Sequence, residues 1–213
     1  MKKLHDFVYS SPVLEFVKKC KQFTDIMEED FPEGRQDVVI RLLQVLPGLY
    51  SDMISLPVNE PILDAANEKY VNEEMWSGIY QKLASILGSQ NEYLDVPEDT
   101  EYDKLEVISR ELSEDLSDIY QDIRDFTEVF RIGTEEVMND VLWECRMNFE
   151  NYWGKKLLRA SLNLHKIMLR DEEILDRMDR EFDEKAGSRE YRADEWFLSR
   201  RQHETGEEGG FPE

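Results

Sequence analysis

Apolar residues recur at spacings of three and four along most of this chain, as they do in amphipathic helices that share a core. The clearest run covers residues 105–130, with apolar positions at Leu105, Ile108, Leu112, Leu116, Ile119, Ile123, Phe126 and Phe130. No long segment of the sequence alternates apolar and polar residues as a half-buried strand does. The pattern therefore predicts an all-α protein, an antiparallel bundle of five to six helices with an acidic C-terminal extension.

Capping and helix-breaking residues place the first two helices. The first begins at Ser11, a candidate N-cap, with Pro12 at the first helical position. The second covers residues 39–53, and Pro47 is expected to bend or break it because proline removes a backbone hydrogen bond. Residues 56–70 show no clear period and are predicted to form a connection.

Three further helices follow this connection. Asn72 is a candidate N-cap for the third, and Gly88 supplies its stop. The long run described above is the fourth and ends at Gly133, and Thr134 caps a fifth helix in which Gly154 marks a bend. Because only two residues join the fourth and fifth helices, we expect these to be antiparallel neighbours, with residues equidistant from the link lying level.

The composition changes after Arg170, where charged residues dominate and one weak apolar stripe remains. We expect residues 1–170 to form the bundle domain and residues 171–213 to form a charged C-terminal extension, helical in part and disordered at its end. Trp196 and Phe197 lie in this extension, which has no core of its own. These two aromatic residues therefore either dock on the bundle or anchor a partner.

Acidic residues outnumber basic ones by 48 to 26, which gives a formal net charge of −22. Half of that charge lies in residues 91–128, which contain fourteen acidic residues and three basic ones. A surface of this kind repels phosphate backbones and anionic lipid, and it attracts basic proteins or cations. We therefore expect no direct binding to nucleic acid or membrane, and a basic protein as the partner.

The cysteines and the absence of catalytic motifs narrow the class of protein. Cys20 and Cys145 lie on apolar helical faces, where unpaired thiols pack as small hydrophobic groups. Without a disulfide framework, and without about eighteen consecutive apolar residues to span a membrane, the sequence favours a cytoplasmic location. No nucleophile motif, zinc-ligand pair or glycine-rich phosphate loop is found in the sequence, so we assign no catalytic residue and no cofactor.

Four segments of the sequence resemble, in their order, a known bacterial family. They are LPGLY at 46–50, YLDV at 93–96, DIYQDIRDF at 118–126 and NYWGKKLLRASLNLH at 151–165. The family is catalogued as domain of unknown function 5063, and the likeness covers roughly residues 8–169. The resemblance implies an all-helical bacterial cytoplasmic domain. It brings no activity, cofactor or site residue with it.

One face of the fourth predicted helix carries a row of acids, which we call the carboxylate ladder. Its members, spaced four, three, four and three, are Glu111, Asp115, Asp118, Asp122 and Asp125. Like charges at these spacings cost about 0.2 to 0.5 kcal/mol per pair on an exposed helix. We therefore expect a solvated face on which Asp118→Asn or Asp122→Asn is neutral or stabilising. The ladder is also the candidate surface for a basic partner.

The link between the fourth and fifth helices leaves two arrangements of their acidic flanks. In the first, the flanks converge and bring together Asp122, Asp125, Asp140 and Glu144, which requires a divalent cation or raised pKa values. In the second, these carboxylates lie outside, and Arg124 faces the fifth helix. We favour the second arrangement because it costs less electrostatic energy without a ligand.

These features favour a non-catalytic protein, an acidic interaction or regulatory module that binds a basic partner, with Trp196 and Phe197 as candidate anchors. One form of this hypothesis is a DNA mimic, since carboxylates about 5 to 6 Å apart on a helix approximate a row of phosphates. The alternative is a divalent-cation-dependent hydrolase that uses the four converging carboxylates of the first arrangement.

Overall fold

The computed structural model describes residues 2–32, 34–63, 67–97 and 107–171, together with Ile174, Asp176, Met178 and Arg180. The contacts of the chain divide it into two units, Met1–Asp171 and Glu172–Glu213. The elements, all in the first unit, are α1 (Lys2–Val8), α2 (Ser11–Glu28), α3 (Arg35–Ser55), α4 (Glu73–Leu87), the 3₁₀ turn η1 (Gly88–Gln90), β1 (Glu92–Asp95), β2 (Ile108–Glu111), α5 (Leu112–Ile132), α6 (Glu135–Asn148), the π-helical turn η2 (Phe149–Trp153) and α7 (Gly154–Arg170).

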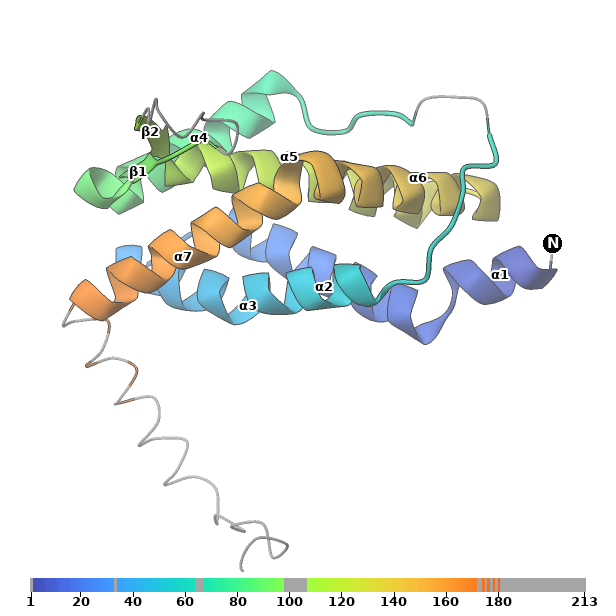
Figure 1. Cartoon of the computed structure of the whole chain (residues 1–213), viewed down its shortest axis with the longest axis horizontal. Helices are drawn as coiled ribbons and strands as arrows, with labels where there is room; N and C mark the ends of the chain where they lie inside the picture. The colour runs from blue at the N-terminus through green and yellow to red at the C-terminus, as the bar shows by residue number, and fades with distance from the viewer. Residues whose placement is uncertain are drawn as a thin grey trace, which may run out of the picture. The chain divides into compact units, whose positions relative to one another are not determined.

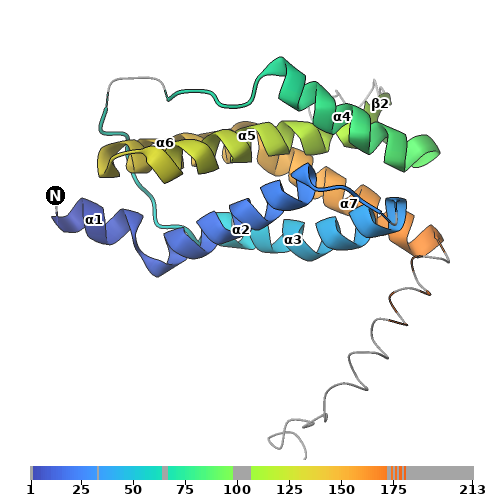
Figure 2. The same cartoon turned by 180° about the vertical axis from the view of Figure 1, so that it is seen from behind.

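Helix α5 is the centre of the bundle, because it packs against α2, α4, α6 and α7 (Figure 1, Figure 2). Its apolar stripe explains this position, since Leu116, Ile119 and Ile123 are fully buried. Phe126 extends the stripe and meets Phe16 of α2, with ring centroids 5.4 Å apart. The predicted all-α fold class is confirmed.

The predicted capping residues of the third helix behave as expected. The backbone N–H of Met75 donates to Asn72 Oδ1 at 2.9 Å, so Asn72 caps α4. Gly88 ends this helix with a φ of +54°, a value that favours glycine. Cys20 and Cys145 are buried and unpaired, and burial raises the pKa of both thiols.

Pro47 does not break helix α3, which continues through it to Ser55. By length and composition it is the one helix in the described ranges that could cross a membrane, but the core helix of a soluble bundle passes the same test. Leu42, Leu46 and Leu49 are fully buried, and the helix packs against α2 and α7. Helix α3 is therefore a core helix of the bundle.

A short antiparallel strand pair precedes α5, and it was not predicted. Strand β2 pairs with β1, with Glu111 opposite Glu92 and Ile108 opposite Asp95. The prediction that the fourth helix includes Ile108 is therefore wrong, while Leu105 lies outside the described residues. The cause is a capping contact, because Asn91 accepts the N–H of Leu112 with its carbonyl oxygen and that of Ser113 with its side chain.

Helices α6 and α7 were predicted as one helix with a bend, and the π-helical turn η2 joins them. Gly154 is at the bend, and its N–H donates to the carbonyl oxygen of Phe149, five residues earlier. The turn brings the backbone of Gly154 very close to that of Phe149. A Cβ on residue 154 would lie 2.5 Å from that oxygen and 2.9 Å from the Phe149 ring.

Gly154→Ala should therefore destabilise the protein by about 2 kcal/mol or more, since neither the oxygen nor the packed ring can move away cheaply. The control is Gly78→Ala in α4, where an added Cβ meets nothing within 4 Å. That change should stabilise the fold by about 0.5 to 1 kcal/mol through helix propensity. Chemical denaturation measures both values, and equal effects at the two sites would contradict this account of the π turn.

Candidate functional site

The carboxylate ladder is the predicted binding site, and the structure places its first two members in polar contacts. Glu111 lies at the end of β2 and accepts a hydrogen bond from the hydroxyl of Tyr80. Asp115 is only 2% exposed and accepts one from the hydroxyl of Tyr93. The Lys156 ammonium lies 3.5 Å from the same carboxylate. This end of the ladder is therefore not a solvated face.

Asp118 accepts three hydrogen bonds from the protein. Trp76 Nε1 donates to Oδ1 at 2.9 Å, while Tyr152 Oη and Lys156 Nζ donate to Oδ2 at 2.5 and 2.6 Å. Lys156 is itself buried. Burial lowers the pKa of Lys156, but the bond to Asp118 and the nearby charges outweigh this effect and leave the pKa raised. The result is a buried, hydrogen-bonded ion pair between α5 and α7.

Asp122 and Asp125 of α5 lie close to Glu144 of α6, and all three line one pocket. Asn148 Nδ2 donates to Asp122 Oδ1 at 2.7 Å. The ammonium of Lys69 lies 2.8 Å from Glu144 Oε1 and 3.8 Å from Asp125 Oδ2. A small pocket at this point has these side chains in its wall, and its full lining is Asn67, Glu68, Lys69, Asp122, Asp125, Phe126, Val141, Glu144, Cys145 and Asn148.

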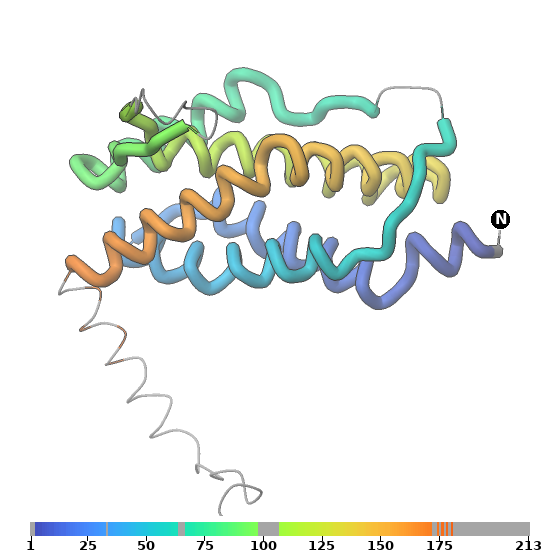
Figure 3. The backbone as a smooth tube through the Cα atoms, viewed as in Figure 1, coloured from blue at the N-terminus to red at the C-terminus, as the bar shows by residue number. Residues whose placement is uncertain are grey.

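Lys69 belongs to an extended segment that joins α3 to α4, and we call residues 56–63 and 67–72 the strap. In Figure 3 the strap passes the N-terminal end of α6 and then runs beside α5 and α6 to reach α4. Carboxylates accept its backbone N–H groups. Asp125 Oδ1 accepts those of Tyr70 and Val71 at 2.8 Å each, and Asp140 accepts those of Ile62 and Leu63 at 2.7 Å each.

Side chains of α6 bind the strap at further points. Asn59 Nδ2 donates to the backbone carbonyl oxygen of Asn139. The side-chain amide of Asn139 donates in turn to the backbone carbonyl oxygen of Glu60. The guanidinium of Arg146 donates to the carbonyl oxygens of Leu56 and Pro57. An extended segment has no internal partners for its backbone groups, so the surrounding helices must supply them. Side chains of α5 and α6 supply partners for four N–H groups and three carbonyl oxygens of the strap.

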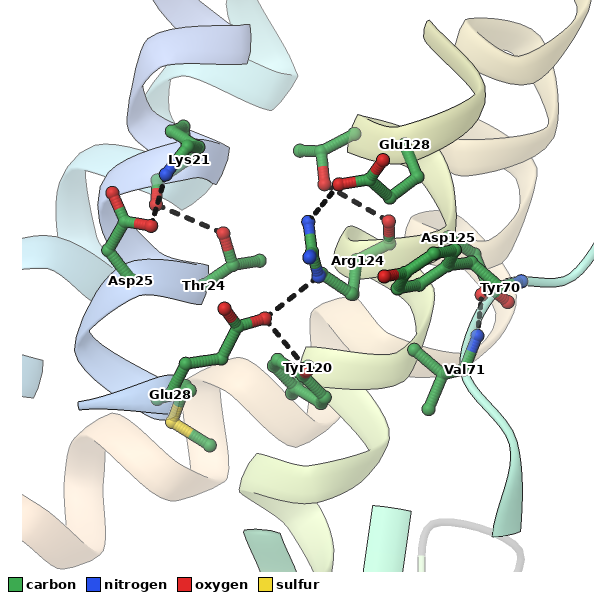
Figure 4. A network of polar contacts seen from close by, with 12 residues as sticks. Lys21, Thr24, Asp25, Glu28, Tyr70, Val71, Tyr120, Arg124, Asp125 and Glu128 are labelled. Carbon is green, nitrogen blue, oxygen red and sulfur yellow. Dashed lines mark hydrogen bonds and ion pairs between the residues drawn. The ribbon is translucent and has the colours of Figure 1, made fainter. Parts of the chain in front are cut away.

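These contacts correct our choice between the two helix arrangements, because the acidic flanks of α5 and α6 face the same side. The favoured arrangement, with the carboxylates outside and Arg124 toward the fifth helix, is wrong. Figure 4 shows Arg124 turned toward Glu28 of α2, 2.8 Å from its carboxylate, while the adjacent Asp125 meets Val71 of the strap. The strap supplies the backbone N–H groups and the Lys69 ammonium that offset the repulsion between the converging carboxylates.

The four acids of the hydrolase alternative do not lie in one cluster. Asp122, Asp125 and Glu144 line the pocket around Lys69, whereas Asp140 is outside its lining and binds the strap backbone. Within the described ranges, no group of three or more His, Cys, Asp or Glu residues is arranged to hold a metal ion. The geometry therefore offers protein donors, rather than a cation, as the partners of these carboxylates.

Asp122 is a ladder acid whose surroundings disfavour its charged form. Burial raises its pKa to about 6, and the charges of Asp125 and Asp118 add to the increase, while the bond from Asn148 and the charge of Lys69 oppose it. For Glu144, burial also acts to raise the pKa, but the bonds from Lys69 and Asn67 outweigh it and lower the pKa. Lys69 therefore stabilises Glu144 more than it stabilises Asp122.

Two predicted site residues, Trp196 and Phe197, lie outside the described residues. Sequence analysis also missed the strap as a part of the site. The signal was present in the prolines at 57 and 61, which leave an extended segment, and in the polar face of the fifth predicted helix, where Asn139, Asp140 and Glu144 follow one another at helical spacing.

The fold and its internal carboxylate contacts define a helical bundle domain with one short strand pair. The chain belongs to the family described as Domain of unknown function (DUF5063), whose model matches residues 7–170, and this confirms the predicted resemblance. It is similar to protein BF1032 from Bacteroides fragilis, whose crystal structure shares 37% sequence identity and a TM-score of 0.67, covering 76% of this chain and 94% of that one. No curated protein matches the chain. Neither of these names states an activity.

The structure separates two substitutions that the sequence treated alike. Asp122→Asn should stabilise the protein by about 1 to 3 kcal/mol above pH 6, because the folded state holds Asp122 at a pKa of about 6, above its value in the unfolded chain. The cost of ionising a carboxyl with a raised pKa grows as the pH rises from about 4 to about 6. The gain should therefore vanish near pH 4.

Asp118→Asn is the matched comparison, one helical turn away, and it should destabilise by about 2 to 4 kcal/mol. The change leaves the buried ammonium of Lys156 beside a neutral amide. Urea denaturation at several pH values measures both variants. Stabilisation by Asp118→Asn, or a gain from Asp122→Asn that does not depend on pH, would contradict these assignments.

Asp140→Asn should loosen the strap. Each oxygen of Asp140 accepts one backbone N–H, so an amide would place its NH₂ group against one of those donors. We expect a loss of about 1 to 3 kcal/mol and faster proteolytic cleavage within residues 56–72. Glu60→Gln, which removes an exposed strap charge, is the control and should alter neither quantity. Equal cleavage rates in the two variants would show that Asp140 does not hold the strap.

Proposed function

We propose that this protein is a non-catalytic cytoplasmic interaction module that binds a basic protein partner, and that the strap is its contact surface. The observation that supports this proposal is the orientation of the strap. Its backbone N–H groups at four positions are bonded inward to Asp125 and Asp140, while apolar side chains lie exposed on its outer side. The carboxylate ladder, the surface predicted from sequence, is occupied by these and other internal contacts.

The exposed composition of the strap fits a basic partner. Val58 is 83% exposed, and Ile62, Leu63 and Tyr70 are also exposed. Exposed apolar residues grouped in this way are typical of protein contact sites. Exposed acids lie on the strap and in the first turn of α4, and they are Glu60, Glu68, Glu73 and Glu74. Apolar contacts would supply affinity, and the glutamates would attract a basic surface and raise the association rate.

The bonds beneath the strap would also favour binding. A loop that orders on binding loses conformational entropy, at about 0.5 to 1.5 kcal/mol for each immobilised side chain. A strap already held by carboxylates at two places loses less. On this proposal the buried acids act indirectly, as positioning residues, and the exposed glutamates carry the attraction that sequence analysis gave to the ladder. The DNA-mimic form of the hypothesis would then depend on those glutamates.

The hydrolase alternative receives no comparable support. Its four carboxylates, Asp122, Asp125, Asp140 and Glu144, each accept a hydrogen bond from the protein. Their arrangement serves the strap, and no observation among the described residues singles out a reacting group.

A binding experiment with paired variants tests the proposed function. The full chain is immobilised and incubated with host cytoplasm at low and high salt. A basic protein should be retained, and the double change Val58→Ser and Ile62→Ser should reduce its retention about tenfold, because exposed apolar contacts are lost. Glu60→Gln with Glu68→Gln should weaken retention at low salt and flatten its salt dependence.

Leu162→Ser, which alters an exposed leucine of α7, is the control and should retain the partner fully. The proposal fails if no basic protein is retained, or if retention of the basic protein survives both strap changes.

A further inference from the structure

Helix α7 carries a second exposed apolar surface, on the side opposite the core. Leu158, Leu162 and Leu169 are 51%, 54% and 57% exposed. At 3.6 residues per turn, their spacings of four and seven place all three within about 40° of one another around the helix axis. Leu157 and Leu164, which are buried, lie on the other side. We call these three outward residues the leucine stripe, and about half of each side chain remains exposed in the folded domain.

Helix α7 is basic, although the chain as a whole is acidic. Residues 154–170 contain five basic residues and no acidic residue, in a chain whose net charge is −22. Two of the five, Lys156 and Arg159, turn toward carboxylates of the domain. Lys166 and Arg170 are exposed, and helical spacing places both on one flank of the leucine stripe. The ammonium of Lys166 contacts a neutral oxygen, Asn163 Oδ1, at 3.4 Å.

We propose that this face of α7 binds an acidic amphipathic helix of a protein partner. Leucines at spacings of four and seven match the single apolar stripe of such a helix, which lies along α7 with its own apolar residues between them. Acidic side chains on its flank pair with Lys166 and Arg170. This proposal does not rest on the strap, because the two surfaces differ in sequence, position and charge.

The other occupants of this face fit less well. A second copy packed stripe to stripe would bring the bases of two α7 helices together, and like charges across an interface are unfavourable. An anionic membrane would attract α7 but repel the acidic surface of the whole chain, and three leucines bury little area in lipid. An acidic helix matches the apolar pattern and the local charge at once.

Titration of the full chain with two synthetic helical peptides tests the proposal. Both carry leucine at the a and d positions of successive heptads, and the flanking positions are glutamate in one and lysine in the other. Fluorescence anisotropy should show the glutamate peptide binding about tenfold more tightly, despite the net charge of the protein. Leu162→Asp should weaken this binding about tenfold or more, and Lys166→Gln with Arg170→Gln about fivefold.

Controls separate a local effect from a loss of fold. Leu162 is exposed, so its variant should keep the circular dichroism of the native protein, and Leu158→Ser provides a second, milder change that should also weaken binding. Val58→Ser, on the strap, should leave it unchanged. The proposal is overturned by equal binding of the two peptides, by binding of neither, or by full binding to the Leu162→Asp variant.

Two further measurements identify the competing occupants. Binding of the full chain to vesicles of phosphatidylcholine and phosphatidylserine that is lost in Leu162→Asp would assign this face to a membrane. A dimer in light scattering that the same change dissociates would assign it to a second copy. Either result would overturn the proposal of an acidic partner.

Discussion

Buried carboxylates and unpaired backbone N–H groups impose the same requirement on this protein, and each satisfies the other. An extended connection between two helices has donors that no regular element can pair, and acids within a bundle have charges that burial makes costly. The strap brings its donors to Asp125 and Asp140, and Lys69 brings a positive charge to the acids beside them. The path of the chain from α3 to α4 depends on this exchange, as does the burial of acids along α5.

Helix α5 can serve several neighbours because adjacent residues point about 100° apart. Arg124 pairs with Glu28 of α2, Asp125 binds the strap, and Phe126 enters the core against α2. A helix at the centre of a bundle has no wholly solvated face, so its polar residues must also find partners. The spacing of the ladder acids, which sequence analysis took for a solvent-facing pattern, is the spacing of contacts to β1, α4, α6, α7 and the strap.

Apolar periodicity was sufficient to predict the helices, because the burial of one stripe per helix is a local property of the sequence. The prediction failed where a distant residue decides the outcome. Residues 108–111 continue the apolar period, but Asn91 caps α5 at Leu112 and leaves them to pair with β1. The roles of Asp140 and Asp125 were equally hidden, since a carboxylate that accepts a distant backbone N–H looks in sequence like any exposed acid.

The π turn at Phe149–Trp153 determines which residues of α7 face outward. Cys145, Phe149, Trp153 and Leu157 follow at steps of four, and an ordinary α-helix drifts by about 40° with each such step. The wider turn absorbs that drift, so Leu157 is buried on the same side as Cys145. The number of residues in this turn, together with its width, therefore sets which side chains of α7 face the core. Loss of one residue from the turn would close it to an ordinary α-helical turn and keep Leu157 on the side of Cys145, because eleven residues make three turns plus about 20°. The same loss from the α-helical part of α7 would rotate everything after it by about 100° and exchange its inner and outer faces.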